Sequence, residues 1–153
     1  NSVFNGRSDD DAAGTAILVN VPCTLNITNC EINGYMHAVI VRGGTAVIRD
    51  SVLTNTVEGD SLLHYFDNRD WADGNTVNLA ALTIGNKHPT SYQYPADCTL
   101  INTRVVSVGA YPAVYAYGNT GEGLGATLTY DAECEIVGGF VEGNDAVTVN
   151  APN

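Results

Sequence analysis

The sequence predicts an all-β fold, a right-handed three-sided parallel β-helix of nearly six coils in one domain, residues 1–153. Short alternations of apolar and polar residues recur along the chain. Several of them bend at an Asn or Asp and resume after a small residue, as in ITNCEI (27–32) and IRDSVL (48–53), although Ala81 breaks this column of bend residues. The chain also contains 16 glycines and no long stretch with a 3.6-residue apolar period, which favours strands and turns over helices.

The repeat is clearest at the small residue after each bend, which recurs at steps of 28, 21, 31, 21 and 31 residues. A period between about 20 and 50 residues is typical of solenoids, because such short strands bury their inward faces only when stacked. The right hand follows from the general rule for parallel crossovers. The alternative is a β-sandwich with coincidental spacing. The column of small residues is Ser2, Cys30, Ser51, Leu82, Thr103 and Cys134, and the apolar column two residues further on is Phe4, Ile32, Leu53, Ile84, Val105 and Ile136.

The bends themselves carry Asn29, Asp50 and Asn102. Asn and Asp tolerate the left-handed backbone region better than other non-glycine residues, and their side chains bond locally. The sequence therefore predicts a tight left-handed bend at each of these three positions.

Several segments resemble a known group: CTLNITNCEINGYMHAVIVRGG (23–44), TAVIRDSVLTN (45–55), AALTIGN (80–86) and PAVYAYGNTGEGLGATLTYD (112–131). They are similar to the right-handed parallel β-helix (pectin-lyase-like) repeat domains of large surface proteins from gut Firmicutes. The resemblance covers nearly the whole chain and implies a fold. It implies no single activity, because that fold hosts lyases, hydrolases, adhesins and tail-spike-like binders.

Composition narrows the classes of partner. The formal net charge is −11, and Lys87 is the single lysine. Nucleic acids and anionic membranes need Lys/Arg patches, so we expect neither as a partner, and no apolar run reaches the roughly 18 residues of a bilayer span. We expect an extracellular or cell-surface location and, since the chain starts at Asn1, a fragment of a longer β-helix protein.

Four cysteines raise the question of disulfides. The predicted register puts Cys30 and Cys134 in one column four rungs apart, and Cys23 and Cys98 about three rungs apart. A bridge needs Cα atoms within about 7 Å, so we expect buried, reduced thiols that act as small core residues. No Cys or His cluster has the spacing of zinc ligands.

The outward positions of the third strand of each coil are the candidate ligand-binding surface. Aromatic faces beside amide and carboxylate groups are what a sugar-binding surface needs. The alternative is that these residues are ordinary surface β-formers and that Trp71 covers an apolar patch. The candidate ligand-binding residues are His64, Phe66, Gln93, Tyr115 and Tyr117, with Trp71 in the excursion FDNRDWADGN (66–75).

Acidic residues gather in loops, and the run Asp9, Asp10 and Asp11 is a weak calcium candidate. Solvated acidic loops are the commoner outcome. We therefore expect no cofactor, with calcium at this run as the alternative.

Three functions remain open. The first is a non-catalytic cell-surface module that binds a polysaccharide or host glycan. The second is a polysaccharide lyase or glycoside hydrolase acting through Asp67, Asp70 and Arg69, although these share one loop rather than stacked strands. The third is a structural spacer, or a filament module that associates end to end.

Overall fold

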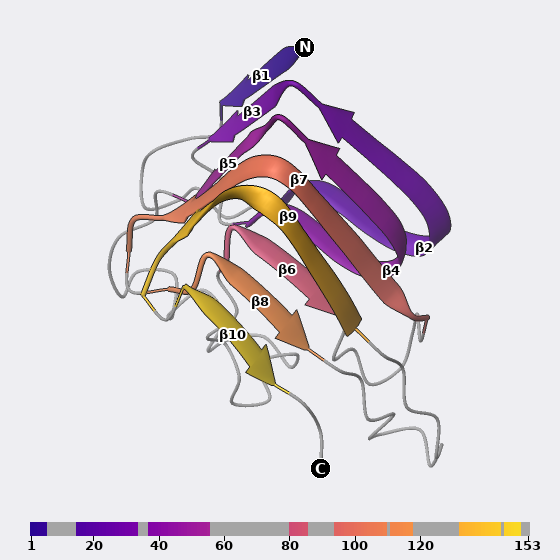
Figure 1. Cartoon of the computed structure of the whole chain (residues 1–153). Helices are drawn as coiled ribbons and strands as arrows, with labels where there is room; N and C mark the ends of the chain where they lie inside the picture. The colour runs from indigo at the N-terminus through magenta and orange to yellow at the C-terminus, as the bar shows by residue number, and fades with distance from the viewer. Residues whose placement is uncertain are drawn as a thin grey trace.

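The computed structural model describes residues 1–5, 15–33, 37–55, 80–85, 94–109, 111–117, 132–144 and 146–150. Within these ranges the protein is all-β, with ten strands in a single sheet (Figure 1), and no described helix is long and apolar enough to cross a membrane. The strands are β1 (Ser2–Asn5), β2 (Thr15–Thr28), β3 (Cys30–Asn33), β4 (His37–Arg49), β5 (Val52–Asn55), β6 (Leu82–Gly85), β7 (Ala96–Ser107), β8 (Val114–Tyr117), β9 (Ala132–Glu142) and β10 (Val147–Asn150).

The strands pair in three parallel ladders. The first ladder joins the later parts of β2 and β4 to the early parts of β7 and β9. The second joins β1, β3 and β5 to the later parts of β7 and β9, and the third joins the early parts of β2 and β4 to β6, β8 and β10. The chain visits the ladders in a fixed order and adds one strand to each as it proceeds (Figure 1).

The core lies between the ladders and is one cluster of buried residues. Ile48 and Leu100 in the first ladder, Leu53 in the second and Leu82 in the third are all fully buried. They sit at alternate positions of their strands, so the period-2 apolar pattern of the sequence marks the inward faces. The inward columns are Ile27–Ile48–Leu100–Ile136 in the first ladder, Phe4–Ile32–Leu53–Val105–Val141 in the second and Val19–Val41–Ile84–Ala116–Val149 in the third.

The predicted register is correct for part of the chain and wrong for the rest. Phe4, Ile32, Leu53 and Val105 do form one column, but Leu53 pairs directly with Val105. That pairing leaves no place between them for Ile84, which belongs to the third ladder. The last predicted members are also displaced, because Ile136 pairs with Leu100 and Cys134 with Cys98 in the first ladder. The ladders hold at most five described strands each, so the expected six rungs are one too many.

Every strand pairing among the described residues is parallel, which contradicts the β-sandwich alternative with its antiparallel hairpins. The predicted bends are confirmed. Asn29, Asp50 and Asn102 have φ values of 53°, 47° and 47°, and each lies between a first-ladder and a second-ladder strand. Gly138, with φ 70°, occupies the equivalent place in β9.

Candidate functional site

Most of the predicted site residues lie outside the described part of the chain. This applies to His64, Phe66, Trp71 and Gln93, to the alternative catalytic group Asp67, Arg69 and Asp70, and to the calcium candidates Asp9, Asp10 and Asp11. The described candidates are Tyr115 and, for its backbone, Tyr117, both in β8.

The outward column of the third ladder differs from the predicted one. Tyr115 pairs with Thr83 on one side and Thr148 on the other, and Thr83 pairs with Ile40. These two threonines, rather than any of the predicted ligand-binding residues, are the in-register neighbours of Tyr115. Among the described strands, β6 alone lies between β4 and β8.

Tyr115 points away from the core, as predicted, but it is not exposed. Its neighbours Val114 and Ala116 on the strand are buried, and Val114 belongs to the main core cluster. Tyr115 retains only 6% of its surface and packs with Ala80 in a separate small cluster. The expected open aromatic platform is therefore a covered face at this position.

His37 and Thr83 add polar groups to the same face. Nδ1 of His37 lies 3.0 Å from the carbonyl oxygen of Ala80 and 3.5 Å from Oγ1 of Thr83. Burial lowers the pKa of the imidazole to about 4, the hydrogen bond with Ala80 opposes that change, and the charge of Arg42 lowers the pKa further. His37 is therefore a neutral ring at pH 7, and Nδ1–H donates to the Ala80 carbonyl.

Arg42 follows the third-ladder segment of β4 and is half-buried. Burial lowers the pKa of its guanidinium, and no carboxylate of the described residues forms an ion pair with it. Partial burial costs the guanidinium some of its hydration, and no carboxylate of the described residues offsets that loss. Arginine binds planar anions through two parallel hydrogen bonds, so Arg42 is the candidate residue for holding an anion on this face.

We call His37, Arg42, Thr83 and Tyr115 the third-face cluster. Three adjacent strands, β4, β6 and β8, supply it, so the parallel register fixes its spacing. Neither His37 nor Thr83 was among the predicted site residues. The segment AALTIG (80–85) places Thr83 between two apolar residues, and this alternation marks it as an outward residue; the segment carries no signal for His37.

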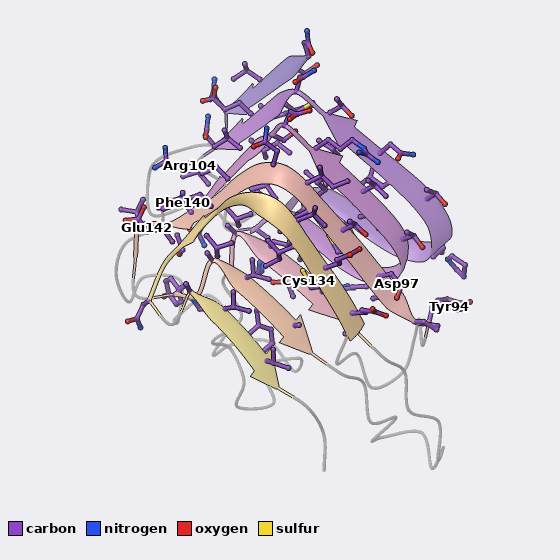
Figure 2. The ribbon with its side chains drawn as sticks, viewed as in Figure 1. Tyr94, Asp97, Arg104, Cys134, Phe140 and Glu142 are labelled. Atoms are coloured by element: carbon purple, nitrogen blue, oxygen red, sulfur yellow. The ribbon has the colours of Figure 1, made fainter. Side chains whose placement is uncertain are left out.

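A second, exposed group lies on the outside of the second ladder. The guanidinium carbon of Arg104 lies 5.5 Å from the centre of the Phe140 ring, and Figure 2 places Glu142 near them. This distance is within the range of a cation–π contact. Arg104 and Phe140 are paired across β7 and β9, and both are exposed. An exposed aromatic side chain, Phe140, therefore lies on the second ladder and not on the predicted third-strand surface.

The cysteines are all free, in agreement with the prediction of reduced thiols. The predicted register, which kept the cysteines too far apart to bridge, is wrong for one pair, because Cys98 and Cys134 are direct neighbours across β7 and β9. Cys23 is exposed, so it is not a core residue. No group of three or more His, Cys, Asp or Glu in the described ranges is arranged to hold a metal ion.

Comparison with protein-family models, with curated proteins and with solved structures finds no match to this chain.

Proposed function

We propose that the three ladders are the faces of a right-handed parallel β-helix, and that it serves as a non-catalytic extracellular or cell-surface module that binds an anionic polysaccharide. The all-parallel pairing and the fixed order of the ladders support the helix. The right hand rests on the general rule for parallel crossovers. With five strands in the longer ladders, the helix has fewer than five complete coils rather than nearly six.

The observation that carries the binding function is the half-buried guanidinium of Arg42 on the third face. Uronate carboxylates of an acidic polysaccharide are planar anions that an Arg binds through two parallel hydrogen bonds. Thr83 on the next strand is buried and its hydroxyl lies 3.5 Å from Nδ1 of His37, so the contact with the ligand is assigned to Arg42. The neutral His37 ring leaves Arg42 as the positive charge of this cluster.

The test is a binding titration with polygalacturonate, with dextran as the neutral polymer. The wild-type protein should bind the first and not the second, with affinity that falls as salt is raised. Arg42→Gln should weaken binding by about tenfold or more, equivalent to about 1.4 kcal/mol. Arg49→Gln is the matched control, because Arg49 is an exposed arginine at the end of the same strand, β4. Equal affinities of the two variants, or no binding by the wild type, would contradict the proposal.

A second candidate is end-to-end association of two copies. The last described strands, β9 and β10, expose apolar residues, among them Phe140 at 51% and Val149 at 69%. At the other end of the sheet Val3 is 62% exposed. Unpaired parallel strands with apolar side chains are templates for further pairing. Sedimentation at rising protein concentration tests this candidate, which predicts species larger than the monomer. A monomer at every concentration would contradict it.

A further inference from the structure

Cys98 and Cys134 meet inside the first ladder. They pair in register on the adjacent parallel strands β7 and β9, in the inward column that also contains Ala46. In-register parallel neighbours have Cα atoms roughly 4.8 Å apart, inside the range of about 4.4–6.8 Å that disulfides use. Both side chains project to the same side of the sheet because they occupy equivalent positions in the pleat.

The two thiols differ in access. Cys98 is 2% exposed, whereas Cys134 is half-buried on the neighbouring strand (Figure 2). Each thiol thus has the other as its sulfur neighbour, and the described residues bring no third His, Cys, Asp or Glu to form a metal site with them. Structural zinc takes four ligands, so this arrangement suits sulfur–sulfur chemistry better than zinc.

We infer that Cys98 and Cys134 form a dithiol site that closes to an intrachain disulfide when a disulfide oxidant, such as oxidised glutathione, reaches Cys134. The inference goes beyond the proposed polysaccharide binding and does not depend on it. The bond would join β7 to β9 within the first ladder and enclose residues 98–134 in a covalent loop.

The chemistry proceeds in two exchanges. The Cys134 thiolate attacks one sulfur of oxidised glutathione, which forms a mixed disulfide and releases one glutathione thiolate. The Cys98 thiolate then attacks the Cys134 sulfur and releases the second glutathione. Two protein thiols are oxidised, one glutathione disulfide is reduced, and the two thiol protons end on the two glutathione molecules.

The contact between the thiols assigns these roles. The hydrogen bond from one thiol to the other lowers the pKa of Cys134, while burial opposes that change. The same hydrogen bond, together with burial, raises the pKa of Cys98. Since the thiolate is the nucleophile, the more exposed Cys134 reacts first and the buried Cys98 resolves the mixed disulfide.

Tryptic mapping of the oxidised wild-type protein tests the pairing directly. Lys87 and Arg104 are the last two trypsin sites of the chain, so trypsin leaves Cys98 alone in peptide 88–104 and Cys134 alone in peptide 105–153. Cys23 and Cys30 stay together in peptide 8–42. After treatment with oxidised glutathione we expect peptides 88–104 and 105–153 to be joined, and to separate on reduction.

A matched variant isolates the pair. Cys23→Ser with Cys30→Ser leaves only Cys98 and Cys134, and its oxidation should lower the mass by about 2 Da and remove both titratable thiols after unfolding. When Cys98→Ser is added to this double variant, the reaction should instead stop at the mixed disulfide on Cys134. The inference is overturned if both thiols of the double variant remain titratable, if it stops as a glutathione adduct, or if peptide 8–42 is the one linked to Cys98 or Cys134.

Discussion

Nδ2 of Asn102 donates a hydrogen bond of 2.7 Å to Oδ1 of Asp50. The two residues are the bends of successive first-to-second ladder passages, and both have φ of 47°. Backbone hydrogen bonds also connect each bend to the next passage. The Asp50 amide donates to the Ile101 carbonyl at 3.0 Å, and the Asn29 amide donates to the Arg49 carbonyl at 3.1 Å. The bend is therefore a stacked row in which each left-handed residue is tied to the next strand.

Replacing Asn102 should separate the two contributions of this row. Asn102→Ala loses the hydrogen bond and puts a residue that avoids the left-handed region at φ 47°, so we expect about 2 kcal/mol of lost stability. Asn102→Gly also loses the hydrogen bond but adopts this φ freely, so we expect about 1 kcal/mol. Urea unfolding measures both. A glycine variant that is less stable than the alanine variant would contradict this explanation of the bend.

These bends could be predicted from the sequence because the requirement is local. A left-handed residue in a tight turn selects Asn, Asp or Gly whichever strand comes next, and Asn29, Asp50 and Asn102 meet it. The alternation of inward and outward residues is local in the same sense. It correctly placed Tyr115 outward on β8 and Val105 inward on β7.

The register could not be predicted in the same way, because it depends on distant chain. The strands LTIG (82–85) and VLTN (52–55) share an alternation, and nothing in it assigns one to the third ladder and the other to the second. The pairing of Leu53 with Val105 spans 52 residues, which the spacing argument divided into two steps. The predicted binding surface was wrong at Tyr115 for a related reason. The burial of Tyr115 depends on the residues that cover it, and the alternation of apolar and polar residues carries no information about them.

The inward column of the first ladder contains two isoleucines of different exposure, and comparing their alanine variants tests the observed register. Ile48 is fully buried and Ile136, two strands away in the same column, is 42% exposed. Ile48→Ala should cost about 3–4 kcal/mol, because it removes buried methyl groups and leaves a cavity. Ile136→Ala should cost about half of that or less, since water already reaches the side chain. Guanidinium unfolding of the two variants gives the comparison, and equal losses would contradict the placement of Ile136 at the outer end of the column.

Gly139 and Gly138 form a second matched pair at the bend of β9. A Cβ on Gly139 would lie 2.3 Å from the Thr103 carbonyl oxygen, at φ +98°, whereas a Cβ on Gly138 would meet nothing within 4 Å, at φ +70°. Gly138→Ala should therefore cost about 1–2 kcal/mol from the backbone conformation alone. Gly139→Ala should cost clearly more, because the β7–β9 pairing must open to admit the methyl group. Thermal unfolding ranks the two variants, and similar melting temperatures would count against the close approach of Thr103.

His37 predicts a pH dependence of stability. Its folded pKa of about 4 lies below the ordinary 6.5, so between these values the unfolded chain binds more protons than the folded one. The contribution of the neutral ring is complete above pH 6.5 and is lost as the pH falls towards 4, by about 3 kcal/mol in all. His37→Asn keeps a donor for the Ala80 carbonyl and removes the titration, so the wild-type free energy of unfolding minus that of the variant should fall by that amount between pH 7.5 and pH 4. The difference cancels the carboxylates that both proteins share. If it is the same at both pH values, the ring is not held neutral by burial.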